Sequence, residues 1–255
     1  MKRISYIGTI AGIMLASTAA YAAPTFDYNI QSFGTNKSDA QTAYELWRDQ
    51  QDAYVTETFE KFASWPDNAG SAVQDPSNTA VGSFTGSGGA GTGTASVQDQ
   101  TKTIVKNTDS EGRNITKQGM KWLDSNDVPT VKWEISGARV GEFGLFNSLA
   151  FFLIDGADAG ATLQVTFGTG ESSTFSLENP FENEGNGNIQ FITGKFSELV
   201  STATVTMQNV DGPTTRDGWG VDNNSIARIP VPASIALLGA GLLGVGIVAR
   251  RRAAV

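Results

Sequence analysis

Thr162-Leu163-Gln164-Val165-Thr166-Phe167 alternates between polar and apolar residues without a break. Successive side chains of a β-strand point to opposite faces, so the three apolar residues of this stretch share one face. Residues 202–207 repeat the pattern, with Ala203, Val205 and Met207 on one face. Two half-buried strands of this kind predict an antiparallel sheet with one face on a core.

Other short runs of β-branched and aromatic residues extend this prediction along the chain. We expect further strands at residues 54–59, 82–85, 102–106, 119–123, 130–135, 148–154, 172–177, 189–193 and 220–226. The two alternating strands described above are expected to span residues 162–168 and 202–208. Gly, Asn, Asp and Pro separate the runs at intervals of about 10–15 residues, which is typical of an antiparallel sandwich or barrel. The sequence therefore predicts an all-β fold.

One short helix is expected near the start. Ser38-Asp39-Ala40-Gln41 reads as a capping box, with Ser38 as the N-cap and Gln41 three residues later. Ala40, Tyr44 and Trp47 then recur at helical spacing, which predicts an amphipathic helix over residues 39–51.

The composition excludes several kinds of chemistry. The chain contains neither His nor Cys, so a Ser-His-Asp triad, a Cys nucleophile, a usual zinc site and a disulfide are all ruled out. Outside the basic residues of the two terminal segments described below, 13 Lys and Arg face 26 Asp and Glu, a net charge of −13. Such an acidic domain repels nucleic acid and attracts divalent cations.

The first 22 residues have the organisation of a secretory signal peptide. Lys2 and Arg3 precede a mostly apolar run at residues 4–19, and Ala20 and Ala22 supply the small residues that signal peptidase requires. We expect cleavage after Ala22 and export of the rest; the alternative is an uncleaved N-terminal anchor.

The last residues form a second signal. Pro230-Val231-Pro232-Ala233-Ser234 is followed by an apolar run at residues 235–249 and then by Arg250-Arg251-Arg252. With Ala233 and Ser234, the apolar run would make a helix about 25 Å long, near the lower limit for spanning a bilayer. The Arg cluster should stay cytoplasmic, which places residues 23–228 outside the inner membrane as one exported domain, with residues 229–255 as its C-terminal signal.

This ending resembles the PEP-CTERM sorting signals of Gram-negative bacteria, in particular the variant with a Val-Pro-Leu-Pro-Ala motif, although Val231 replaces the usual Leu or Glu. The resemblance implies that an exosortase, a membrane-embedded transpeptidase, cleaves near residues 230–234. The protein would be held in the inner membrane transiently and then move to the cell surface or extracellular matrix. The alternative is a permanent single-span anchor.

A second resemblance covers most of the exported part. Thr56-Glu57-Thr58-Phe59-Glu60, residues 146–155 with 158–163, and Asp217-Gly218-Trp219-Gly220-Val221-Asp222-Asn223 are similar to the opening, central and closing strands of a jelly-roll domain common in PEP-CTERM proteins. The resemblance implies an antiparallel jelly-roll β-sandwich like those of concanavalin or carbohydrate-binding modules. That architecture supports lectins, enzymes and inert spacers alike.

The jelly-roll resemblance also implies a metal site. In related domains a calcium ion joins an acidic residue of the first strand to an Asp of the last, and Glu60 and Asp222 match these positions, with Asp217 close by. Calcium needs several oxygen ligands, so backbone carbonyls would complete the set. The alternative is that the Asp residues only make turn-stabilising hydrogen bonds.

Trp65, before Pro66 in an expected loop, and Trp219, flanked by Gly, are the candidate sugar platforms. Trp stacks on the apolar faces of sugar rings. Core packing is the alternative for any Trp in or beside a strand.

We therefore expect a non-enzymatic surface or matrix protein that associates with exopolysaccharide, with exosortase and signal peptidase as processing partners. One alternative is a glycoside hydrolase or lyase on the same sandwich that recruits Glu57, Glu134 or Glu142. Another is a passive spacer.

Overall fold

The computed structural model describes residues 25–64, 72–87, 102–107, 115, 119–125, 128–136, 144–156, 162–167, 171–176, 187–208 and 218–229. The predicted signal-peptidase site at Ala20 and Ala22 and the sorting motif at residues 230–234 lie outside these ranges, as does the apolar run after the motif. Within the described ranges, no helix combines the length and the apolar character needed to cross a bilayer.

Strands are the main regular structure of the described chain. Helix α1 spans Lys37–Arg48, and the strands are β1 (Phe26–Ser32), β2 (Ala53–Glu57), β3 (Gly82–Ser87), β4 (Ile104–Lys106), β5 (Trp122–Asp124), β6 (Thr130–Ser136), β7 (Phe146–Ile154), β8 (Thr162–Phe167), β9 (Glu171–Ser176), β10 (Ile189–Val200), β11 (Thr202–Gln208) and β12 (Gly220–Arg228). Every predicted strand overlaps one of these, and β1 is the strand that the sequence analysis missed.

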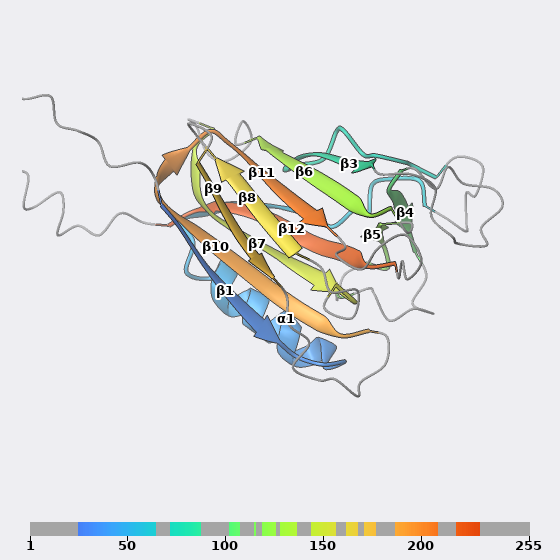
Figure 1. Cartoon of the computed structure of the whole chain (residues 1–255). Helices are drawn as coiled ribbons and strands as arrows, with labels where there is room; N and C mark the ends of the chain where they lie inside the picture. The colour runs from blue at the N-terminus through green and yellow to red at the C-terminus, as the bar shows by residue number, and fades with distance from the viewer. Residues whose placement is uncertain are drawn as a thin grey trace, which may run out of the picture.

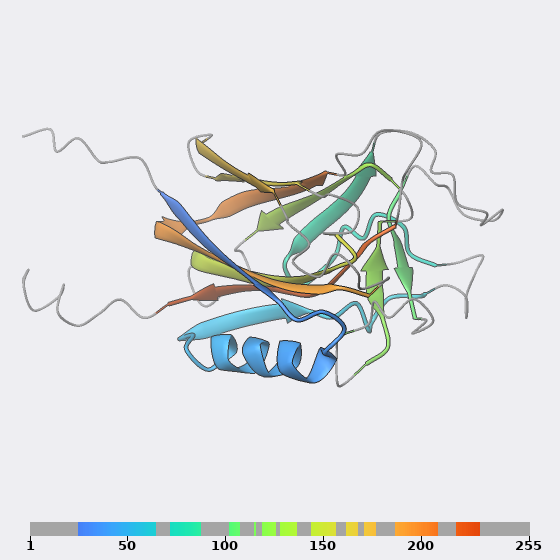
Figure 2. The same cartoon turned by 60° about the horizontal axis from the view of Figure 1, so that its bottom comes forward.

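The strands form two antiparallel sheets that pack face to face (Figures 1 and 2). The first sheet, which we call sheet A, has the order β1-β10-β7-β12-β5-β4, with β2 also paired to β12; sheet B has the order β3-β6-β11-β8-β9. This arrangement confirms the prediction of an all-β, antiparallel, two-sheet fold with one short helix.

The main core fills the space between the sheets. The apolar faces predicted for β8 and β11 both point inward, and all six side chains on them are buried: Leu163, Val165, Phe167, Ala203, Val205 and Met207. Trp133 stacks on Phe84 with ring centroids 5.6 Å apart, and its indole N–H donates to the Val81 carbonyl at 3.2 Å. Strand alternation therefore produces the core that the sequence predicts.

A second apolar cluster lies on the opposite face of sheet A, beneath α1 (Figure 2). Ala40, Tyr44 and Trp47 point toward the sheet, as predicted, and the Tyr44 ring packs against Phe152 and Phe191. The helix thus shields one face of one sheet.

The ends of the helix differ from the prediction. Asn36, not Ser38, is the N-cap, and its side-chain oxygen accepts a hydrogen bond from the Asp39 N–H at 3.2 Å. The helix ends at Arg48 rather than at Gln51, because residues 49 and 50 form a turn into β2. Asn and Ser are comparably good N-cap residues, so both Asn36 and Ser38 could start the helix.

Strand β1 pairs with β10 along the edge of sheet A, with Phe26 opposite Phe196. Its Phe26 ring lies over Gly194, where a Cβ atom would collide with the ring. Glycine at this position therefore lets the edge strand pack closely on its neighbour.

Candidate functional site

The structure describes one of the two predicted sugar platforms, Trp219. Trp219 is 1% exposed and belongs to the core between the sheets. An indole whose faces are covered by other side chains does not present a stacking surface, so the interpretation of Trp219 as a sugar platform is corrected. Trp65 lies outside the described residues.

Glu60, the first predicted calcium ligand, lies in the turn after β2. Its Oε1 accepts a hydrogen bond from the backbone N–H of Lys121 at 2.7 Å. The ammonium group of Lys121 donates to the backbone carbonyls of Glu60 and Phe62 at 2.9 and 2.8 Å. A lysine cation therefore already lies among the oxygens of this turn.

Asp222, the second predicted ligand, is fully buried in β12. Its Oδ1 accepts from the Asn223 N–H at 2.7 Å, and its Oδ2 accepts from the Ile115 N–H at 3.1 Å. Asn223 has a positive φ of 50°, at the point where the register between β12 and β7 shifts. Both carboxylate oxygens thus hold backbone amides at an irregular turn of the strand.

These contacts do not fit the implied calcium site. In the part of the chain that the structure describes, no three acidic side chains come together in a group that could hold a metal ion. Asp217, the third predicted residue, lies outside that part.

The two described carboxylates that were candidates for glycoside hydrolysis, Glu57 and Glu134, lie in different environments. Glu57 is buried and accepts hydrogen bonds from the N–H groups of Phe59 and Ala80, both at 2.8 Å. Glu134 lies exposed on sheet B, where a hydrogen bond from Lys132 lowers the pKa of its carboxyl group. A general acid requires a raised pKa, so Glu134 has the opposite tuning. Glu142 lies outside the described residues.

A pocket of about 250 Å³ opens on the outer face of sheet A, beside the C-terminal end of α1. Its lining residues are Asp27, Tyr28, Asn29, Trp47, Gln50, Gln51, Ser148, Thr193, Gly194, Lys195 and Ile229. We call it the α1-end pocket.

Two rows of paired residues contribute to this pocket from the sheet. Asp27 pairs with Lys195, which in turn pairs with Ser148, and Asn29 pairs with Thr193 on the adjacent row. The pocket therefore contains carboxylate, ammonium, amide and hydroxyl groups from three neighbouring strands.

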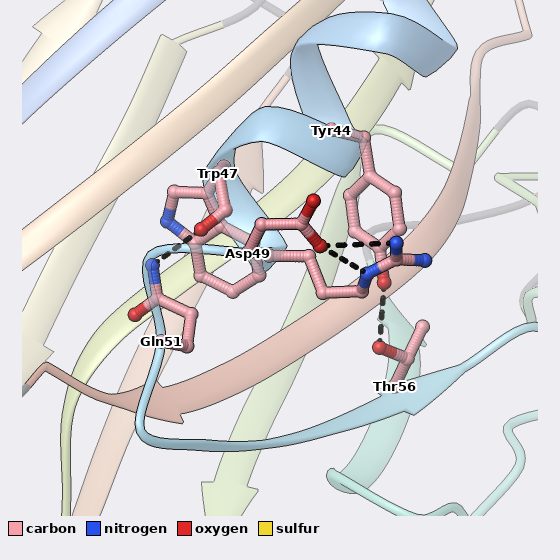
Figure 3. A network of polar contacts seen from close by, with 6 residues as sticks. Tyr44, Trp47, Asp49, Gln51 and Thr56 are labelled. Atoms are coloured by element: carbon pink, nitrogen blue, oxygen red, sulfur yellow. Dashed lines mark hydrogen bonds and ion pairs between the residues drawn. The ribbon is translucent and has the colours of Figure 1, made fainter.

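The end of the helix supplies the other side of the pocket. Trp47 is 9% exposed and belongs to the apolar cluster beneath α1, where its ring stacks on Tyr44. Gln51 donates from Nε2 to the Trp47 carbonyl at 2.6 Å (Figure 3). The Oε1 atom of Gln51 is buried without a hydrogen-bond partner. Tyr28 is 47% exposed, but it shares a strand face with Phe26 and Ile30, which pack on the main core, so its ring points away from the outer face on which the pocket opens.

The sequence analysis missed this pocket, although it named Trp47 as a helix residue. The alternation of Phe26, Tyr28 and Ile30 would have indicated β1. The pairing of β1 with β10, which is far along the chain, carries no short-range signal.

Comparison with known proteins finds only distant similarity to solved structures. No protein-family model matches the chain, and no curated protein matches it either. Among solved structures, the xylan-binding domain CBM22-1 of Xyn10C from Paenibacillus barcinonensis is 12% identical, with a TM-score of 0.34, and the match covers 71% of this chain and 97% of that one. The CBM51-2 and INT domains of ZmpB from Clostridium perfringens are 8% identical, with a TM-score of 0.29, over 69% of this chain and 32% of that one. Both TM-scores are below 0.5, so we infer nothing about binding or activity from either likeness.

Proposed function

We propose that this chain is a non-enzymatic, exported surface or matrix protein that binds exopolysaccharide through the α1-end pocket. The observation that carries the proposal is the lining of that pocket, in which Trp47 lies beside amide, hydroxyl, carboxylate and ammonium groups. Sugar recognition uses this combination, because ring C–H groups pack on aromatic faces while hydroxyls need polar partners.

The size of the pocket favours part of a polymer over a whole small molecule. Its volume of about 250 Å³ lies below the roughly 300–1,000 Å³ of sites that enclose a drug-sized ligand. One sugar unit of a longer chain can enter it while the rest of the polymer remains in solvent. The buried, unpartnered Oε1 of Gln51 would gain a hydrogen bond from a sugar hydroxyl.

The strand order supports a jelly-roll assignment. The segment β2-β12-β7-β10 of one sheet faces β6-β11-β8-β9 of the other. Two interlocked Greek keys of eight strands have this arrangement. Carbohydrate-binding proteins are one of several classes that use it.

Export and sorting complete the proposal. The signal-peptide pattern ending at Ala22 and the proline motif at residues 230–234 support processing at both ends, by signal peptidase and by an exosortase-type transpeptidase. The protein would pass through an inner-membrane form before release to the cell surface or matrix. Substituting Pro230 and Pro232 together by Ala should leave the chain in the membrane fraction. Release of this variant at the wild-type level would contradict sorting through the motif.

Binding can be tested with the full chain in mild detergent, by affinity electrophoresis in gels containing a neutral glucan or an acidic exopolysaccharide. Asn29→Ala should weaken retardation about tenfold, which corresponds to a loss of roughly 1.4 kcal/mol, because Asn29 is exposed and lines the pocket. Gln31→Ala is the matched control, because Gln31 is an exposed amide on the same face of β1 but does not line the pocket.

The outcomes separate the alternatives. If no polymer retards the wild-type chain, the passive-spacer interpretation replaces the proposal. If Asn29→Ala and Gln31→Ala both bind as the wild type does, the α1-end pocket is not the binding site. Release of reducing sugar from the polymer during incubation would indicate an enzyme.

A further inference from the structure

The turn that follows β2 already contains a cation, contributed by the chain itself. We propose that the ammonium group of Lys121 takes the place of a divalent cation in the turn of Glu60, and that backbone amides do so at Asp222, so that the fold is stable without calcium. The proposal does not depend on whether the α1-end pocket binds a polysaccharide.

The contacts of Lys121 resemble those of a bound metal ion. Its ammonium group lies 2.9 Å from the Glu60 carbonyl oxygen and 2.8 Å from that of Phe62, and its backbone N–H holds the Glu60 carboxylate at 2.7 Å. Backbone carbonyls and carboxylates are the usual ligands of calcium. The ammonium group, with its three N–H donors, satisfies the two carbonyl oxygens, and the backbone N–H satisfies the carboxylate.

The space around the Glu60 side chain is also filled. A Cβ atom at Gly119 would collide with the Glu60 carboxylate, so the segment before β5 packs directly on it. Close packing of this kind holds the carboxylate against the backbone N–H of Lys121.

The other carboxylates beside this end of sheet A have lysine partners of their own. Glu57 lies 3.1 Å from the Lys61 ammonium, and the buried Asp124 lies 2.8 Å from that of Lys106. Glu57 pairs with Asn224 of β12, and Asp124 pairs with Gly220, so both carboxylates flank the strand that carries Asp222.

Asp222 itself is stabilised by amides. Both of its oxygens accept backbone N–H groups, and hydrogen bonds of this kind hold a buried carboxylate in its charged form without a metal. Each of the four carboxylates near this strand therefore has its charge compensated by the chain.

The test measures thermal unfolding of the full chain in mild detergent, with EDTA and with excess calcium. The wild-type Tm should differ by less than about 1 °C between the two conditions, whereas a ligand that fills a native site far above its Kd raises Tm by several degrees. Lys121→Met keeps the length of the side chain and removes its charge. It should lower Tm by several degrees in EDTA, and Lys132→Met, at an exposed position of sheet B, should not.

Three results decide the matter. A wild-type Tm that rises by several degrees in calcium, with the rise absent in Asp222→Asn, overturns the proposal. A Lys121→Met variant as stable as the wild type also overturns it, because the ammonium group would then be idle. If Lys121→Met does not fold, calorimetric titration of the wild-type chain with calcium decides: stoichiometric binding that Asp222→Asn abolishes overturns the proposal, and no such binding supports it.

Discussion

The outer faces of the two sheets differ sharply, although both sheets obey the same alternation. On sheet A the positions beneath α1 are large and apolar, with Phe152, Ile154 and Phe191 buried. On sheet B the corresponding outward positions of β8 and β11 are polar, as in Gln164 paired with Thr206. The comparison teaches that alternation predicts which residues share a face, whereas a covering element decides whether that face must be apolar.

The largest effect is expected from opening the cluster beneath the helix. Phe152→Ala should lower the free energy of unfolding by about 3–5 kcal/mol, because it leaves a cavity where the ring packs against Phe191 and Tyr44. Thr206→Ala on sheet B should change it by less than about 0.5 kcal/mol. Urea unfolding followed by Trp fluorescence measures both. Equal costs would mean that α1 does not cover the sheet in solution.

The next largest effect is expected from the ion pairs of the two sheets, one buried and one exposed. The Asp124 side chain is 1% exposed and pairs with Lys106 at 2.8 Å, whereas Lys132 and Glu134 of sheet B pair at 2.6 Å while about half exposed. Lys106→Met should cost about 3 kcal/mol, because it leaves a buried carboxylate without its counter-ion. Lys132→Met should cost less than about 1 kcal/mol. Denaturant unfolding of both variants would refute this ranking if the exposed pair proved the costlier to break.

A smaller effect is expected at the hydroxyl group of Tyr44. It hydrogen-bonds Thr56 at 2.7 Å and Ser225 at 3.2 Å, so Tyr44→Phe should cost about 1 kcal/mol. The cost is moderated because Thr56 and Ser225 still bond each other at 2.8 Å.

The same residue predicts a dependence on alkaline pH. Burial raises the pKa of Tyr44 above its ordinary value of 10.0. The unfolded chain therefore loses this proton first, so the stabilisation is complete below about pH 10 and is lost as the pH rises toward the folded-state pKa. Unfolding midpoints measured across this range should fall more for the wild type than for Tyr44→Phe; parallel curves would place the Tyr44 ring in solvent.

The smallest effect is electrostatic and local to sheet B. The hydrogen bond from Lys132, followed by its charge, lowers the pKa of Glu134. Lys132→Met should move that pKa back toward its ordinary value, as NMR titration of the Glu134 carboxyl carbon would show. An unchanged pKa would mean that the exposed pair is not formed in solution.

Local pattern predicts much of this fold and little of its site. The strands at residues 162–167 and 202–208 follow from alternation, and the buried face of α1 follows from helical spacing. The helix boundary depended on a choice between Asn36 and Ser38, two residues that cap comparably well. That choice is made by how the chain leaves β1, which local spacing does not encode.

The prediction for Trp219 failed for a different reason. Trp219 has the Gly-rich surroundings of an exposed loop, yet the face on which its ring lies is set by the pairing of β12 with β5 and β7. The α1-end pocket similarly needs β1, β10 and the last described residue, Ile229, in one place. Contacts between segments this far apart depend on the order of the strands in the sheet, which no short stretch of sequence reveals.

The two ends of the described domain lie together, since Asp27, near the start of β1, and Ile229, after β12, line one pocket (Figures 1 and 2). A force applied between these ends would act across the strands and not along them. The edge strand β1 would then peel from β10 one hydrogen bond at a time, beginning at Phe26. The domain would yield to such a pull far more readily than to one that shears its strands, however well its core is packed.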